Sequence, residues 1–118
     1  MIEQLLQTAL NEIQAGHAVM LVAVVHSTGS TPRAAGALML AGENGLLGGT
    51  VGGGLLEHRC LEIAAAQPAV PHRETFVLDN RQAGSLGMVC GGTSEILFTP
   101  LTGAAPLTAA LDALRSRA

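Results

Sequence analysis

The chain has 118 residues and a formal net charge of −3, and this length predicts a single domain. Phe76 and Phe98 are the only Phe, Tyr or Trp side chains, and arginine supplies all six Lys/Arg positions. Base stacking and a positively charged surface are typical of nucleic-acid binding, so this composition argues against that class. The lack of lysine excludes a P-loop lysine and a Schiff-base lysine.

Hydrophobic periodicity predicts the elements of the first half of the chain. Apolar residues recur at helical spacing over residues 2–13, and Gly16 is a suitable helix C-cap. The continuous, valine-rich run 18–25 is typical of a strand buried on both faces. Residues 37–40 and 46–47 are expected to be short strands, because Asn44-Gly45 between them is a strong hairpin signal.

The second half continues the alternation of helix and strand. A helix is predicted over residues 55–67 and is ended by Pro68 and Pro71. Strands are predicted over 74–78 and 94–98, and a short last helix over 107–114. The fold class is therefore α/β or α+β, with a central mixed sheet of about five strands and two to three covering helices.

The chain is expected to be a cytoplasmic protein with free thiols. Its N-terminus lacks the basic region of a signal peptide, and its longest apolar run, 18–25, is too short to span a bilayer. The two cysteines form no paired motif.

Three segments rich in small residues stand out, at 27–36, 46–57 and 86–93. The middle one has five glycines between Gly48 and Gly54, directly before a helical pattern. Glycines permit positive φ angles, and a glycine-rich turn that leads into a helix directs several backbone N–H groups at one point. We expect the three segments to meet in space and form one site.

Cys90 is the strongest candidate for chemistry. It is predicted to lie in a turn next to Gly91 and Gly92, whose N–H groups would lower the pKa of its thiol. A thiolate can ligate a metal or carry sulfur. The alternative is a buried small hydrophobic residue, an interpretation that clearly holds for Cys60 on the apolar face of its helix.

Three other side chains have both a functional and an ordinary interpretation. Arg33 could clamp a phosphate or carboxylate, or could be a solvated side chain paired with an acid. Glu57 opens a helix, where its charge suits the helix dipole. His26 could act as a ligand or a base, although such a histidine is more often simply hydrogen-bonded.

The three motifs together resemble those of the N-terminal domain of the XdhC/CoxI family. They read Gly29-Ser30-Thr31-Pro32-Arg33 with Gly36-Ala37, then Gly49-Thr50-Val51-Gly52-Gly53-Gly54 with Leu56-Glu57, then Leu86-Gly87-Met88-Val89-Cys90-Gly91-Gly92. The resemblance implies a domain over residues 1–101, followed by a tail or short helix over 102–118. Family members usually continue into a second, Rossmann-like domain, which is absent from this chain.

The resemblance implies an accessory chaperone of xanthine dehydrogenase and carbon monoxide dehydrogenase rather than an enzyme. Such a protein binds the molybdenum cofactor (molybdopterin) transiently, assists its sulfuration by a cysteine desulfurase and inserts it into an apo molybdenum hydroxylase. Cys90 is then the candidate contact to molybdenum or its sulfur. Arg33 and the amides of 48–54 are candidates for the phosphate end of the pterin. The full set of candidate cofactor contacts is Ser30, Thr31, Arg33, Thr50, Gly52, Gly53, Gly54, Glu57, Cys90, Gly91 and Gly92.

Two alternatives remain open at this stage. In the first, Cys90 is the persulfide-carrying thiol of a sulfur-transfer enzyme, with His26 or Glu57 as the base beside it. In the second, the domain binds no ligand and serves as a dimerisation or interaction module of the maturation complex. A homodimer is compatible with both the chaperone and the module.

Overall fold

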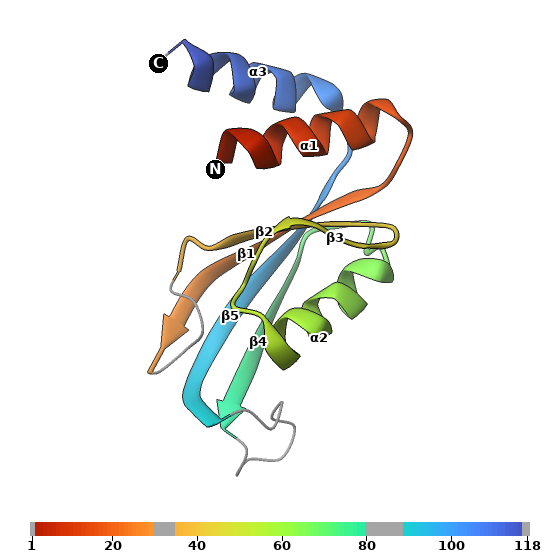
Figure 1. The fold of residues 1–118 in the computed structure, drawn as a ribbon. Helices are drawn as coiled ribbons and strands as arrows, with labels where there is room; N and C mark the ends of the chain where they lie inside the picture. The colour runs from red at the N-terminus through yellow and green to blue at the C-terminus, as the bar shows by residue number, and fades with distance from the viewer. Residues whose placement is uncertain (1, 30–34, 80–88, 117–118) are drawn as a thin grey trace.

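The computed structural model describes residues 2–29, 35–79 and 89–116, which form three helices and five strands (Figure 1). The strands form one sheet in the order β3-β2-β1-β5-β4. The predicted single sheet of five strands with three helices is therefore confirmed. The elements are α1 (Ile2–Gln14), β1 (Val19–Thr28), β2 (Leu38–Gly42), β3 (Gly45–Gly49), α2 (Gly54–Ala65), β4 (His72–Asp79), β5 (Val89–Leu101) and α3 (Ala104–Arg115).

All four strand pairings are antiparallel, so the expected mixed character of the sheet is corrected, and the fold is α+β. Parallel neighbours need a long crossover connection, usually a helix. Among the described residues, the one helix between strands is α2, which joins β3 to β4. Because β3 and β4 are the two edge strands, α2 crosses the whole face of the sheet instead of linking two neighbouring strands.

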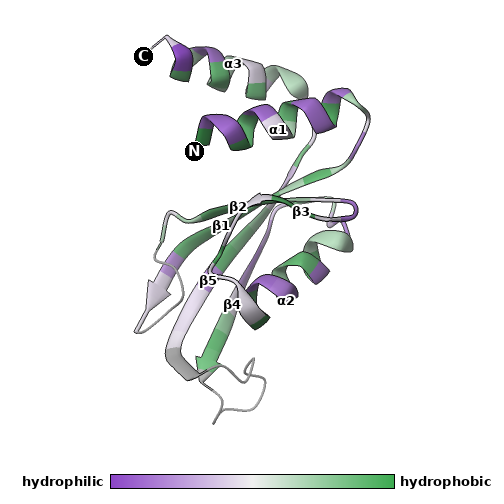
Figure 2. Ribbon diagram, in the orientation of Figure 1, coloured by the Kyte–Doolittle hydropathy of each residue, from purple (hydrophilic) through white to green (hydrophobic). Residues whose placement is uncertain are grey.

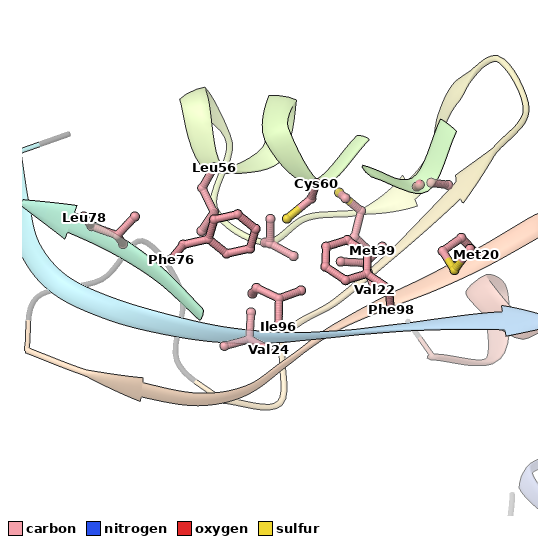
Figure 3. Close-up of a cluster of buried hydrophobic side chains, with 13 residues drawn as sticks. Met20, Val22, Val24, Met39, Leu56, Cys60, Phe76, Leu78, Ile96 and Phe98 are labelled. Atoms are coloured by element: carbon pink, nitrogen blue, oxygen red, sulfur yellow. The ribbon is translucent and has the colours of Figure 1, made fainter. Parts of the chain in front are cut away.

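The larger core lies between the sheet and α2. Leu56 and Cys60 of α2 are fully buried against Phe76, Ile96 and Phe98, which point toward the helix from β4 and β5 (Figure 3). The other buried members of this cluster are Met20, Val22, Val24, Met39, Ala41, Val51, Ala64 and Leu78. These alternate residues of each strand share one face of the sheet, as the period of two in a strand requires.

A second core lies on the opposite side of the sheet, where α1 and α3 pack against each other above one end of the strands (Figure 1). Leu107 and Leu111 of α3 are buried there with Leu5 and Leu10 of α1. Burying two leucine side chains contributes about 3–6 kcal/mol, which is enough to dock a short helix. Green and purple segments alternate along α1 and α2 in Figure 2, as expected of amphipathic helices.

The two ends of the described chain lie close together. Arg115 near the end of α3 donates a hydrogen bond to Gln7 Oε1 of α1 at 2.7 Å, and its guanidinium lies 4.0 Å from Glu3. The longest helix has 13 residues, whereas a membrane-spanning helix needs about 20. Within the described residues, no helix is both long enough and apolar enough to cross a membrane.

Candidate functional site

The three small-residue segments all leave the same end of the sheet, which we call the loop end. It is defined by Thr28 of β1, Leu38 of β2, Gly49 of β3, Asp79 of β4 and Val89 of β5. The antiparallel registers point these five termini in one direction, because β1, β3 and β4 run toward this end while β2 and β5 start from it. The termini lie at different levels, since Leu38 pairs with Ala23, five residues before Thr28, and Val89 lies four residues beyond Thr93, the partner of Thr28. The three segments thus leave the sheet in the same direction, and the expectation that they meet and form one site stays a prediction.

A direct contact joins the first and third segments at the loop end. Thr28 pairs with Thr93 in the β1–β5 register, and their hydroxyl oxygens are hydrogen-bonded. This contact links the start of the first segment to the end of the third. The second segment is tied to β2 by the Thr50 N–H, which donates to the Leu38 carbonyl at 3.1 Å.

The glycine-rich loop before α2 has a conformation that favours glycine. Gly52, Gly53 and Gly54 have φ angles of 125°, 76° and 62°, all in the region that L side chains rarely adopt. Gly49 at the end of β3 has a φ of 72°, and a Cβ atom there would lie 2.2 Å from the Leu38 carbonyl oxygen. The prediction that these glycines satisfy backbone requirements is confirmed.

The amides of this loop are engaged by the loop's own polar side chains. The Gly53 N–H donates to Glu57 Oε1 at 3.3 Å, and the Gly52 N–H donates to Thr50 Oγ1 at 2.9 Å. The Thr50 hydroxyl in turn donates to Glu57 Oε1. A carboxylate thus already lies at the N-terminus of α2, where an incoming anion would otherwise bind.

The turn predicted around Cys90 is wrong. Cys90, Gly91 and Gly92 belong to β5, which starts at Val89, five residues before the predicted strand. Glycine is a poor strand former on its own. The pairing of β5 with β1 ends at Thr93, but Val89 still pairs with Asp79 of β4, so this part of β5 continues the strand beside β4. The backbone of Cys90 is thus placed at the loop end, and the orientation of its side chain lies outside the described structure.

The remaining residues of the first motif, Ser30, Thr31 and Arg33, lie outside the described residues. Their proposed contacts with a ligand stay predictions. What the structure does show is that the segment holding them starts after Thr28 and returns at Gly36, whose N–H donates to the Val24 carbonyl at 2.8 Å.

A groove of about 660 Å³ lies beside the loop end, between α1 and the β2–β3 pair. Its lining combines the return of the first segment at Gly36 and Ala37 with Gly48–Thr50 of the second segment. Ile2 and Leu5 of α1 form the facing wall. A second hollow of about 550 Å³ lies at the opposite end of the sheet and contains none of the predicted site residues.

Cys60 is a structural residue, as the sequence predicts. Its side chain is fully buried beneath α2, and burial raises the pKa of its thiol to about 12. In the described part of the chain, no three His, Cys, Asp or Glu side chains are close enough to hold a metal ion.

One polar side chain at the loop end was not predicted. Ser94 is 1% exposed, and its hydroxyl has no hydrogen-bond partner within the described structure. Ser94 shares a face of β5 with Ile96 and Phe98, so the alternation Ser-x-Ile-x-Phe is the sequence signal that would have identified it as an inward-facing polar residue.

Two comparisons relate this chain to known proteins. The profile of the XdhC and CoxI family matches residues 12–79, a span that contains the first two motifs and ends before the third. The structure is also similar to the crystal structure of a protein named as a xanthine dehydrogenase from Bacillus halodurans, with a TM-score of 0.78 and 27% sequence identity.

That similarity covers 97% of this chain and 35% of the Bacillus protein, so this chain spans about a third of its length. A search of curated protein sequences gives no match. The family profile nevertheless covers more than half of the chain, and it includes the glycine-rich loop whose geometry is described above. The chain belongs to the XdhC and CoxI family.

Proposed function

We propose that this protein binds the molybdenum cofactor and assists its sulfuration and its insertion into an apo-hydroxylase of the xanthine dehydrogenase type. The observation that supports the proposal is that the segments carrying all three family motifs leave the sheet in the same direction, at the loop end. A carrier must hold its ligand and then release it, and a site made of loops and small residues offers contacts without a buried cage.

The residues at the loop end fit such a ligand in two respects. The unpaired, buried hydroxyl of Ser94 is a hydrogen-bonding group without an internal partner, and such groups are rare in folded proteins. Cys90, placed at the same end by β5, offers a soft ligand of the kind that metals with sulfur ligands accept. When bound, the cofactor would supply a molybdenum centre that can take up sulfur.

The contacts to the phosphate of the cofactor are assigned by charge. Because the Glu57 carboxylate accepts hydrogen bonds from Thr50 and Gly53, a second anion at these groups would meet a negative charge. In our proposal the phosphate therefore binds to Arg33, with Ser30 and Thr31 as further donors. Thr50, Gly52, Gly53, Gly54 and Glu57 then shape the wall of the site, while Cys90, Gly91 and Gly92 face the metal end.

The partners in this proposal are an apo molybdenum hydroxylase and a cysteine desulfurase. A homodimer is proposed as well, because β3 and β4 are edge strands whose outer backbone groups can pair with another chain.

Cofactor retention tests the proposal directly. Reduced protein is mixed anaerobically with molybdenum cofactor and passed through a gel-filtration column, and molybdenum and oxidised-pterin fluorescence are measured in the protein peak. We expect near-stoichiometric retention by the wild type and a clear loss in Cys90→Ala and in Arg33→Ala. The matched controls are Cys60→Ala, which removes the buried thiol, and Arg59→Ala, which removes an exposed arginine of α2. Retention that falls equally in the controls, or no retention by the wild type, would contradict the proposal.

The sulfur-transfer enzyme is less well supported by the geometry. His26 pairs with Glu95, and Cys90 lies five residues before Glu95 on β5. Because a strand covers about 16 Å over five residues, the backbone of His26 is too far from that of Cys90 for His26 to serve as the base beside the thiol. Glu57, the other candidate base, is engaged by the glycine-rich loop. The interaction module makes the opposite prediction to the chaperone: no retention of cofactor, and unchanged partner binding in Cys90→Ala.

A further inference from the structure

We propose that Ser94 is a ligand-binding residue, and that its hydroxyl forms a hydrogen bond with a neutral, flat heterocycle, which is the pterin ring system if the proposed function holds. The inference rests on that function for the identity of the ligand. The structure supplies the rest of the inference, which is the choice of Ser94 and the chemical nature of the ligand group that its hydroxyl would bind.

The first observation is the state of the hydroxyl. Ser94 is 1% exposed, and within the described part of the chain its Oγ is buried without a hydrogen-bond partner. A buried polar group without a partner destabilises a protein, because its hydrogen bonds to water are lost and nothing replaces them. Such a cost calls for an explanation, and a ligand that supplies the missing partner is one.

The second observation is the position of Ser94 under the start of α2. Ser94 pairs with Phe76 of β4 and with Ser27 of β1. Phe76 in turn packs against Leu56 in the first turn of α2 (Figure 3). Ser94 therefore lies beside Phe76 in the layer beneath the first turn of α2.

The third observation is that the side chains on this face become smaller toward the loop end. Along β5 they run from Phe98 and Ile96 to Ser94 and then to Gly92, all four of them buried. Well-packed cores are filled by large apolar side chains. A buried serine followed by a buried glycine means that β5 itself contributes little side-chain volume at this end of the face.

The surroundings select the chemistry of the ligand group. The Glu57 carboxylate at the start of α2 disfavours an anion there, and Phe76, Leu56 and Leu78 make the neighbourhood apolar. A hydroxyl can donate and accept. A neutral ring with edge donors and acceptors suits both features, whereas a phosphate suits neither.

The test uses Ser94→Ala, which removes only the hydroxyl. In the ligand-free protein we expect an unchanged or higher melting temperature, because an unpaired buried group is removed. In equilibrium gel filtration with molybdenum cofactor we expect the dissociation constant to rise about three- to tenfold, as for the loss of one hydrogen bond. Thr99→Val is the matched control, since Thr99 is another β5 hydroxyl on the opposite face of the strand.

The outcomes separate this inference from the proposed function. Wild-type protein that retains the cofactor, with Ser94→Ala retaining it equally well, would overturn the role of Ser94 and leave the chaperone intact. A marked fall in the melting temperature of ligand-free Ser94→Ala would also overturn it, because the hydroxyl would then have a structural partner. If wild-type protein retains no cofactor, the proposed function fails and the ligand assigned to Ser94 fails with it.

Discussion

Replacing Gly49 with alanine should destabilise the protein by far more than an ordinary glycine substitution. Two effects add at this position. Gly49 has a φ of 72°, and this left-handed conformation costs an L residue about 1–2 kcal/mol. In addition, the new Cβ would lie 2.2 Å from the Leu38 carbonyl oxygen. That oxygen accepts the Thr50 N–H, so moving it also weakens a hydrogen bond worth about 1 kcal/mol net.

The sum of these effects is about 2–3 kcal/mol of unfolding free energy. For a chain of 118 residues, 1 kcal/mol corresponds to about 4 °C in melting temperature, so we expect Gly49→Ala to melt about 8–12 °C lower than the wild type.

Gly16→Ala is the matched control for this substitution. Gly16 has a φ of 85° with no atom within 4 Å of the position of a new Cβ, so its substitution causes backbone strain without a clash. We expect a drop of about 4–8 °C for the control. If calorimetry shows the two variants melting within about 2 °C of each other, the reasoning from the Leu38 contact is refuted.

Three further predictions concern single side chains. The hydrogen bond to the Glu12 carboxylate raises the pKa of His17 above its usual 6.5. The stabilisation from the His17–Glu12 pair is therefore complete below about pH 6.5 and is lost as the pH rises through the raised pKa. Urea unfolding should show His17→Gln destabilised at pH 5.5 and much less so at pH 8.5, and equal losses at both pH values would contradict this. In a Cys90→Ser background, the buried Cys60 thiol should not react with Ellman's reagent at pH 8 until the protein is unfolded, and rapid labelling of the native protein would show that it is accessible. Glu57→Ala should lower the free energy of unfolding by about 1–3 kcal/mol because two hydrogen bonds to a carboxylate are lost. Glu57→Gln keeps an acceptor oxygen and should lose less than half as much in the same urea titration.

Local signals were sufficient for the elements whose conformation is set by their own residues. Asn44-Gly45 predicted the β2–β3 hairpin, and Gly45 has a φ of 126° there. The apolar spacing of α1 and α2 predicted both helices and the burial of Cys60. These features follow from the two periodicities of helix and strand and from the conformational freedom of glycine.

Features that depend on distant partners were predicted less well. Residues 89–93 were expected to be a turn because Gly91 and Gly92 are poor strand formers, yet they extend β5, which pairs with β4 at Val89 and at Thr93. The last helix was predicted to be shorter, although Leu107 and Leu111 pack firmly in the second core. In both cases tertiary contacts outweigh local propensity, and no local pattern states which segments become neighbours.

The candidate site shows the same division between local and distant information. The motifs were identified from residue types, and the sheet topology brings the segments that carry them to one end. The engagement of the loop amides was not predicted, because Glu57 is four residues after Gly53 and does not fit the usual capping pattern, in which the acid comes three residues after the cap. The buried Ser94 hydroxyl without a hydrogen-bond partner was not predicted, because its surroundings depend on how β1, β4 and β5 come together.

The built-in carboxylate changes how the glycine-rich loop should be understood. A loop whose amides are empty would attract any anion, including free phosphate. Here the Glu57 carboxylate already engages the Gly53 N–H and the Thr50 hydroxyl, so the loop keeps its shape without a ligand and carries a negative charge at the start of α2. In the proposed complex, a ligand with a single phosphate therefore has its neutral ring toward α2 and Ser94 and its phosphate toward Arg33. In this proposal the charge of Glu57 gives the bound ligand a direction, which a set of glycines alone would not do.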